Sequence, residues 1–346
     1  MNIAVLCGGL SPERDVSITS GTKATAALRR RGHRVFFVDL FLGYPGIIEN
    51  PLELFTTRQS DDTAHVSETA PDLERLLRSR AESDTARMGP NVLEICKAAD
   101  IVFMALHGSD GEDGKVQATF DLLGIRYTGT GSFASMIAMN KEFTKIIFEK
   151  HGISTPGYTA VTPQKNLVDI PYPRVVKPVN GGSSIGVSIV HDDHEYAEAL
   201  TEAFKYDATA LVEPFVSGRE CSVGVIAGAA LPVIEIVPHS GFYDYKNKYQ
   251  GLTDEPCPAD FPESVTAKLQ KAAVEVFEIL QLEAYARMDF IVDAAENIWC
   301  LEANTLPGLT PTSLLPQEAA VIGITYDDLC ERIIEESMKK YKGTSR

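Results

Sequence analysis

The stretch RMDFIVDAAENIWCLEANTLPG, residues 287–308, constrains the fold more than any other part of the chain. Two runs of alternating apolar and polar residues flank a short polar turn, and this pattern predicts a β-hairpin. The turn centre falls between Ala295 and Glu296, so Asp289 lies directly opposite Glu302 in the predicted ladder. Period-two alternation then assigns every side chain of the hairpin to one of its two faces.

Four polar side chains share one predicted face of this hairpin: Arg287, Asp289, Glu302 and Asn304. The other face is apolar and carries Met288, Phe290, Leu301 and Ala303. Two opposed carboxylates repel each other, and a divalent cation between them would remove that cost. Carboxylate and amide oxygens suit Mg²⁺ or Mn²⁺. The alternative is a solvated face on which Arg287 pairs with Asp289. The NTLPG turn that follows favours the metal site, because it places backbone N–H groups just beyond these oxygens.

A second stretch, RVVKPVNGGSSIGVSIV at residues 174–190, predicts a strand that ends near Lys177, a Gly- and Ser-rich loop and another strand. This order differs from a P-loop, in which the glycines lead into a helix and the lysine follows them. The backbone N–H groups and hydroxyls of the loop can fold over a polyphosphate as a lid. The residues that would do so are Gly181, Gly182, Ser183 and Ser184. A mobile hairpin tip is the alternative interpretation.

The segment ALVEPFVSGREC, residues 210–221, combines a strand-like run with two carboxylates, Glu213 and Glu220. Pro214 and the irregular residues after it predict an extended linker. The backbone of such a linker can bind the edge of an adenine, and a carboxylate there can accept hydrogen bonds from two ribose hydroxyls. An ordinary charge at the end of a strand is the alternative interpretation of Glu213.

Several loops of the N-terminal part follow apolar strand-like runs. GGLSPERDVS, residues 8–17, has the glycines and the helix start of a phosphate cradle, yet Glu13 is an anion where a phosphate would bind. ALHGSDGED, residues 105–113, places His107 at the end of a strand, where open α/β sheets bind ligands. A loop-stabilising role is the alternative for His107. GTGSFA, residues 129–134, matches a dinucleotide fingerprint but lacks the acidic residue expected about 20 positions later, so we interpret it as a turn.

The chain divides into three predicted domains of an α/β fold that is α+β in part. Residues 1–128 alternate strands and helices, which favours an open, mostly parallel sheet, with an insertion at about 41–90. Residues 129–215 hold one long predicted helix, 133–151, followed by strands and a further helix. Residues 216–346 carry the short alternating runs that are typical of an antiparallel sheet, with a helix across one face.

The charge balance excludes some classes of partner. The chain has 48 acidic and 32 basic residues, a formal net charge of −16, and such a field repels nucleic acid and anionic membranes. No apolar run approaches the roughly 20 residues of a membrane span, and no secretory signal is visible. Six scattered cysteines without metal-type spacing are typical of free thiols in a reducing compartment. We therefore expect a cytoplasmic protein without nucleic-acid or membrane partners.

The motifs, taken in order, resemble those of the D-alanine–D-alanine ligase family, whose members have the ATP-grasp fold. The resemblance covers residues 3–330 apart from the insertion and implies an N-terminal α/β domain and two α+β subdomains that clamp ATP. Family members are usually dimers, so the resemblance also implies a homodimer. Eight stretches carry it: GGLSPERDVS, ALHGSDGEDG, MNK, VVKPVNGGSSIGVS, VEPFVSGREC, YDYKNKY, RMDF and EANTLPGLTPTSLLP.

The resemblance also implies roles for individual residues. ATP binding is implied for Lys141, Lys177, Ser183, Ser184, Glu213, Pro214, Val216, Glu220 and Lys248. Two Mg²⁺ (or Mn²⁺) ions are implied at Asp289, Glu302 and Asn304. The first D-alanine would bind near Glu13, His107, Ser183 and Tyr249, and the second near Arg287, Gly308, Ser313 and Leu314. Catalytic roles are implied for Glu13, Ser183, Tyr249, Arg287 and Gly308.

The reaction implied by the resemblance has two steps. The carboxylate of one D-alanine attacks the γ-phosphoryl group of ATP, and the amine of a second D-alanine then displaces phosphate from the acyl phosphate. The products are D-alanyl-D-alanine, ADP and phosphate, and the dipeptide is a peptidoglycan precursor. Tyr249 favours D-alanine over D-lactate as the second substrate, but it separates D-alanine from D-serine less sharply. The alternatives are therefore a D-alanine–D-serine ligase or another ATP-grasp carboxylate–amine ligase. Asn140 departs from the Asp that is usual in the family.

Two other classes of function account for less of the sequence. A nicotinamide-dependent oxidoreductase would leave the carboxylates of the hairpin unexplained. A non-catalytic ATP-binding regulator would not need both Arg287 and Lys248.

Overall fold

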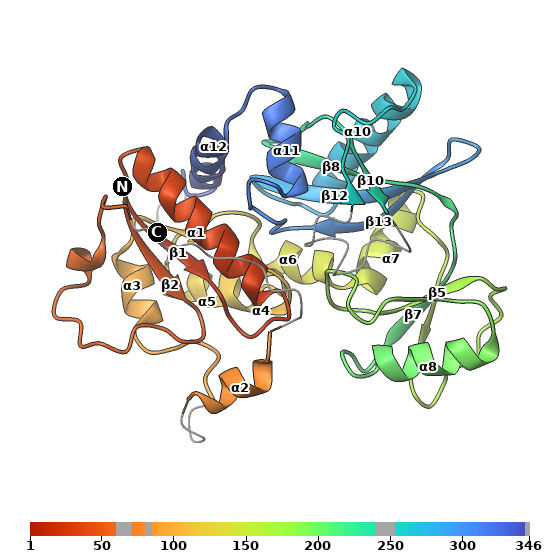
Figure 1. Ribbon diagram of the computed structural model, residues 1–346, viewed down its shortest axis with the longest axis horizontal. Helices are drawn as coiled ribbons and strands as arrows, with labels where there is room; N and C mark the ends of the chain where they lie inside the picture. The colour runs from red at the N-terminus through yellow and green to blue at the C-terminus, as the bar shows by residue number, and fades with distance from the viewer. Residues whose placement is uncertain (60–70, 81–84, 240–252, 343–346) are drawn as a thin grey trace.

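The computed structural model of the chain describes residues 1–59, 71–80, 85–239 and 253–342. Its strands form three sheets, which Figure 1 shows at the left, the lower right and the upper right of the molecule. This mixed architecture confirms the predicted fold class. Within the described residues, no helix is both long and apolar enough to cross a membrane.

The N-terminal sheet has three parallel strands in the order β2-β1-β3, as the alternation of strands and helices predicted. The strands are β1 (Asn2–Cys7), β2 (Arg34–Asp39) and β3 (Ile101–Met104). Strands β1 and β3 are almost entirely buried, which explains why they read as continuous apolar runs. The helices of this part are α1 (Arg14–Arg30), α3 (Val92–Ala98), α4 (Ser109–Glu112) and α5 (Lys115–Leu123). The described residues of the insertion include the short helices η1 (Pro51–Leu54) and α2 (Leu73–Arg78).

The predicted helix 133–151 is wrong as a single element, because it is two helices, α6 (Ser132–Met139) and α7 (Lys141–His151). Asn140 interrupts the helix with an extended backbone (φ −88°, ψ 102°), and its side chain caps α7 by accepting a hydrogen bond from Phe143 N at 3.0 Å. The break also lets Lys141 N donate to Val179 O at 3.0 Å. A tertiary contact therefore overrides the local helix propensity.

The second sheet is antiparallel, with strands in the order β4-β7-β5-β6. Its apolar core contains residues of all four strands and of one face of helix α8, including Val176, Val212 and Leu200. The strands are β4 (Thr159–Val161), β5 (Arg174–Pro178), β6 (Ser188–Val190) and β7 (Ala210–Pro214), and the helix is α8 (Asp193–Ala203). The Gly- and Ser-rich loop connects β5 to β6, so it leaves the sheet at one end of a hairpin.

The third sheet is antiparallel, in the order β11-β10-β8-β12-β13, with β9 paired to β8. The strands are β8 (Gly218–Ile226), β9 (Ala229–Ala230), β10 (Ile234–Pro238), β11 (Thr253–Asp254), β12 (Tyr285–Asp293) and β13 (Ile298–Asn304). Helices α6, α7 and α10 (Glu263–Ile279) pack against its apolar face. Helix α11 (Leu314–Val321) follows, and α12 (Tyr326–Lys339) lies beside α1, as Figure 1 shows.

The predicted register of the hairpin β12–β13 is confirmed where it matters for the site. Arg287 pairs with Asn304, and Asp289 pairs with Glu302. A β-bulge then shifts the ladder after Asp289, so that Phe290 pairs with Cys300. The prediction that Leu301 lies on the apolar face is wrong, because the bulge turns it toward the same cavity as Glu302.

Candidate active site

A cavity between the second and third sheets brings together residues from segments far apart in the sequence. Helix α7, strands β5 and β7 and the hairpin β12–β13 all contribute side chains to its walls. The predicted site residues that line it are Lys141, Lys177, Ser184, Glu213, Pro214, Val216, Glu220, Asp289 and Glu302. We refer to this space as the nucleotide cavity, after the ligand that the family resemblance implies for it.

One wall of the nucleotide cavity contains a carboxylate between two lysines. Glu213 is 2% exposed; its Oε2 accepts a hydrogen bond from Lys177 Nζ at 2.8 Å, and its Oε1 lies 2.9 Å from Lys145 Nζ. Burial raises the pKa of the Glu213 carboxyl, but the two lysines outweigh burial and hold this pKa below its usual value. Lys145 was not predicted, although its position four residues after Lys141 places both lysines on one face of α7.

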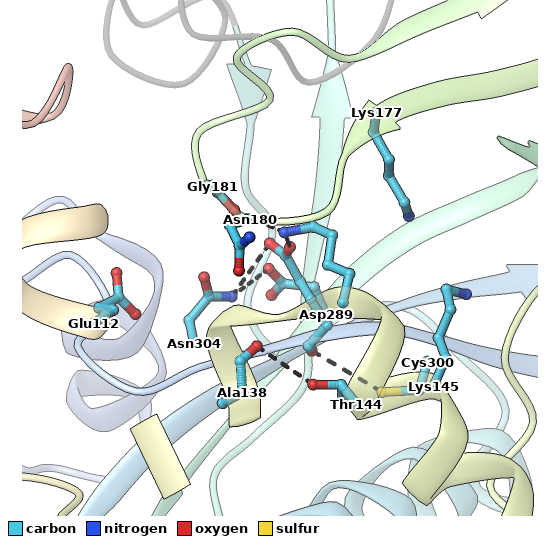
Figure 2. A network of polar contacts seen from close by, with 12 residues as sticks. Glu112, Ala138, Thr144, Lys145, Lys177, Asn180, Gly181, Asp289, Cys300 and Asn304 are labelled. Carbon is cyan, nitrogen blue, oxygen red and sulfur yellow. Dashed lines mark hydrogen bonds and ion pairs between the residues drawn. The ribbon is translucent and has the colours of Figure 1, made fainter. Parts of the chain in front are cut away.

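The polar face of the hairpin also pairs each carboxylate with a cation. Arg287 donates to Asp289 through Nε at 2.9 Å and Nη2 at 2.8 Å, and Asn304 Nδ2 donates to Asp289 Oδ2 at 2.9 Å. Lys141 Nζ lies 2.9 Å from Glu302 Oε2 and donates to Gly181 O at 2.7 Å. Figure 2 shows Asp289, Asn304 and Gly181 gathered in this network. The pairing of Arg287 with Asp289 is the one that the alternative to a metal site predicted.

The donor set of the hairpin fits a divalent cation that arrives with phosphates. Among the described residues, no three His, Cys, Asp or Glu side chains form a cluster that holds a metal by itself. Asp289, Glu302 and Asn304 instead offer two carboxylates and one amide. Mg²⁺ is usually held by one or two carboxylates together with substrate phosphates and water, so this incomplete set is of the expected kind.

Glu13 joins the N-terminal loop to the Gly- and Ser-rich loop across 170 positions of sequence. Its carboxylate accepts a hydrogen bond from the Ser183 hydroxyl, and both side chains are almost fully buried. Glycines make room for it: a Cβ at Gly108 would lie 2.6 Å from Glu13 Oε2, and one at Gly182 would lie 3.0 Å away. Ser183 and Ser184 have φ angles of 50° and 56°, a left-handed conformation that costs an L-residue roughly 1–2 kcal/mol. The loop is thus shaped by its contacts and not by backbone preference.

His107 is buried beside Glu13 with both ring nitrogens engaged. Nδ1–H donates to Leu306 O at 2.8 Å, and Nε2 accepts from the Ser20 hydroxyl at 3.0 Å. Burial lowers the pKa of His107 and outweighs the opposite effect of the nearby Glu13. A neutral imidazole held in this way fits the loop-stabilising alternative, since both nitrogens are already used.

Glu112, at the end of α4, is a functional candidate that the sequence analysis missed. Its carboxylate accepts three backbone hydrogen bonds, from Gly108 N at 3.1 Å, Thr305 N at 3.0 Å and Leu306 N at 3.1 Å. Burial and the charge of Glu13 raise the pKa of Glu112 to about 7. It therefore fastens the NTLPG turn to the N-terminal part. The segment ALHGSDGED contained this signal, but only His107 was considered there.

The residues predicted for the second amino acid lie around the start of α11. Ser313 is the N-cap position of this helix, and its hydroxyl accepts from Thr310 N at 3.1 Å. A Cβ at Gly308 would lie 2.8 Å from Ser313 Oγ, so a side chain there would have to displace this hydroxyl, and Leu314 is buried next in the chain. Helix N-termini attract carboxylates. The two remaining predicted residues, Lys248 and Tyr249, lie outside the described residues.

A cavity between two α+β parts, lined by lysines that pair with carboxylates, is typical of the ATP-grasp class of proteins. Two family models match the chain: "D-ala D-ala ligase N-terminus" over residues 2–130 and "D-ala D-ala ligase C-terminus" over residues 147–335. The chain therefore belongs to the D-alanine–D-alanine ligase family, a family of ATP-dependent ligases.

Individual relatives agree with this assignment over the full chain. The D-alanine–D-alanine ligase of Lacticaseibacillus casei is 44% identical and aligns over 99% of this chain and 97% of its own length. That of Pediococcus pentosaceus is 43% identical, with 99% of both chains covered. The crystal structure of the Bacillus anthracis enzyme complexed with ATP superposes with a TM-score of 0.76 at 29% identity, covering 99% of both chains.

Proposed function

We propose that the protein joins two D-alanine molecules in an ATP-dependent reaction that proceeds through D-alanyl phosphate. The observation that supports this most directly is the nucleotide cavity, where Lys141, Lys177 and Glu213 face Asp289 and Glu302. The dipeptide product serves peptidoglycan precursor synthesis, as it does in the family to which the chain belongs.

ATP occupies the nucleotide cavity in this proposal. Glu213 and the backbone at Pro214 and Val216 bind the adenine, and Glu220 binds the ribose. Lys141 and Lys177 leave their carboxylate partners to bind phosphates, with Ser183, Ser184 and Lys248 closing over them. Asp289, Glu302 and Asn304 hold two Mg²⁺ ions, which would neutralise phosphate charge so that an anionic nucleophile can approach.

The two amino acids bind on either side of the reacting phosphoryl group. Glu13 binds the ammonium of the first D-alanine, with Ser183 and Tyr249 as hydrogen-bond partners and His107 behind them. Arg287, Ser313 and Leu314 hold the second D-alanine with its carboxylate near the start of α11. Arg287 and the backbone N–H of Gly308 then stabilise the oxyanion of the second step, an arrangement that depends on donors fixed in advance.

The test is a substrate panel with the purified protein, ATP and Mg²⁺. We expect phosphate release that depends on D-alanine and a dipeptide of the mass of D-alanyl-D-alanine. A mixed product that dominates when D-serine competes with D-alanine would instead support the alternative, a D-alanine–D-serine ligase. An absence of D-alanine-dependent phosphate release would contradict the ligase proposal altogether.

Two further properties remain predictions. The family resemblance implies a homodimer in solution, and the scattered cysteines favour a cytoplasmic location. Sedimentation and fractionation experiments test them independently of catalysis.

A further inference from the structure

Lys145 is a buried cation that the proposed reaction does not use. It is 0% exposed, and its ammonium group contacts three oxygens. Nζ donates to the Thr155 hydroxyl at 2.7 Å and to Pro156 O at 2.8 Å, and it lies 2.9 Å from Glu213 Oε1. A lysine is rarely buried to this degree without a partner that requires its charge.

Its partner Glu213 is shared with a second lysine. Lys177 Nζ donates to the other oxygen of the same carboxylate at 2.8 Å. Figure 2 shows the side chains of Lys145 and Lys177 extending toward each other from α7 and β5. Two cations therefore compensate one buried anion, which is one cation more than neutrality requires.

The two lysines differ in what holds them. Lys145 has two neutral oxygen partners besides Glu213, the Thr155 hydroxyl and Pro156 O, and these hold its ammonium group in place. Lys177 lines the nucleotide cavity, and Glu213 is its ion-pair partner among the described residues. Lys177 is thus the lysine that can change partners, and Lys145 is the one that stays.

We infer that Lys145 is a positioning residue for nucleotide binding, which keeps Glu213 ionised and in place while Lys177 moves from Glu213 to the phosphates of ATP. This inference rests on the proposed roles of Glu213 and Lys177. Without Lys145, the departure of Lys177 would leave a buried carboxylate with no cation beside it, and that state is strongly disfavoured. Lys177 would then remain on Glu213 and be lost to the nucleotide.

The pKa of Lys145 shows that burial disfavours its charged form. Burial lowers this pKa to about 8, with Glu213 acting in the opposite direction and Lys177 in the same one. Glu213 in turn has a lowered pKa. The pair is therefore ionised near neutral pH, which a role in compensating Glu213 requires.

A purely structural role is the competing interpretation, because Thr155 and Pro156 follow α7 in sequence and Lys145 fastens them to it. The two interpretations differ in their dependence on Glu213. A structural fastener acts the same whether residue 213 is charged or neutral, whereas a compensating cation loses its purpose when residue 213 carries no charge.

The test is a double-mutant cycle with Lys145→Met, Glu213→Gln and the double variant. In the wild-type background, Lys145→Met should raise KM for ATP about tenfold, with kcat and KM for D-alanine changed less than about threefold. In the Glu213→Gln background the same substitution should change KM for ATP less than about twofold. Lys150→Met, an exposed position on the same helix, is the matched control and should leave every constant unchanged.

The outcomes separate this inference from the proposed function. An equal rise in KM in both backgrounds would overturn the positioning role alone and leave a structural one. A Glu213→Gln variant with unchanged KM for ATP would overturn the proposed adenine role of Glu213, and the inference with it. If Lys145→Met unfolds below the assay temperature, Thr155→Val replaces it in the cycle. Thr155→Val removes one hydrogen-bond partner of the Lys145 ammonium group and keeps its charge. A coupling to Glu213→Gln of the same sign is then expected.

Discussion

In the nucleotide cavity the buried carboxylate of Glu213 contacts two lysines, whereas in the N-terminal loop the buried carboxylate of Glu13 contacts a serine hydroxyl. Glu112 is held by backbone N–H groups alone. Within the described ranges, neither Glu13 nor Glu112 forms an ion pair with a lysine or arginine. The two regions therefore hold their buried carboxylates in different ways: two lysines contact Glu213, whereas among the described residues no lysine or arginine pairs with Glu13 or Glu112.

This difference corresponds to the ligands that each region is proposed to bind. In the nucleotide cavity, Lys141 and Lys177 are paired with carboxylates, and an incoming polyphosphate can recruit both because it carries more negative charge than either partner. In the N-terminal loop, Glu13 has no lysine or arginine partner among the described residues, and the ammonium group of an amino acid would supply a cation. Under the proposed function, each region would thus gain its missing charge partner from its own substrate.

The largest effect on the rate is expected for Glu302→Gln in the nucleotide cavity. The amide neither ligates Mg²⁺ as a carboxylate does nor pairs with Lys141, whose ammonium lies 2.9 Å from Glu302 Oε2. We expect kcat/KM to fall about 10³-fold, with a higher Mg²⁺ concentration needed for half-maximal rate. Initial rates of phosphate release over a Mg²⁺ titration measure both quantities.

Glu296→Gln is the control, since Glu296 is an exposed carboxylate in the turn of the same hairpin. It should retain the rate of the unmodified protein. A Glu302→Gln variant that keeps its rate within threefold of this control would show that the hairpin face is the solvated ion-pair surface and not a metal site.

The second largest effect is expected for Glu13→Gln in the N-terminal loop. The neutral amide still accepts from Ser183, but it loses the charge that would bind the ammonium of the first D-alanine. We expect KM for the first D-alanine to rise about 10- to 100-fold while the affinity for ATP stays nearly unchanged. The dependence of rate on D-alanine concentration and calorimetric titration with an unreactive ATP analogue measure the two.

The exposed Glu94→Gln on α3 is the control for this variant and should bind both substrates normally. A large loss of ATP affinity in Glu13→Gln would contradict the division between the regions. The loop GGLSPERDVS would then be a phosphate cradle after all.

Local patterns predicted the parts of the site that depend on neighbours in sequence. The pairing of Asp289 with Glu302 followed from a period of two and a turn centre, and both are properties of one short stretch. The bulge that turned Leu301 toward the cavity could not be predicted, because alternation alone does not reveal an extra residue. The break at Asn140 depends on pairing with Asn180, which only the folded chain supplies.

Long-range contacts explain why the remaining site residues were missed. Glu112 accepts hydrogen bonds from residues 193 and 194 positions away, and those donors are backbone groups that every sequence contains. The spacing of Lys145 from Lys141 can be read from the sequence, but its partner Glu213 lies on strand β7, which is far from helix α7 in the sequence. Contacts between residues so far apart in the sequence can be predicted only once the topology of the fold is known.

The smallest effect concerns Glu112, which joins the N-terminal part to the NTLPG turn. It is expected in the free energy of unfolding and not in the rate. The pKa of Glu112 is raised from 4.5 to about 7 by burial and by Glu13. Below about pH 4.5 the carboxyl is protonated in both the folded and the unfolded state, and between 4.5 and 7 only the folded state keeps the proton. Stability from this group is therefore present at low pH and lost as pH rises through about 7, a contribution of about 3 kcal/mol.

Glu112→Gln removes this titration, because the amide binds no proton at either pH. We expect the free energy of unfolding, measured with urea, to differ between pH 5 and pH 8 by about 2 kcal/mol less than in the unmodified protein. Glu335→Gln, an exposed substitution on α12, should retain the original difference. An unchanged pH dependence in Glu112→Gln would mean that Glu112 is ionised throughout this range. The backbone N–H groups would then lower the pKa of Glu112 by more than burial and the charge of Glu13 raise it, and Glu112 would stay ionised in the folded state.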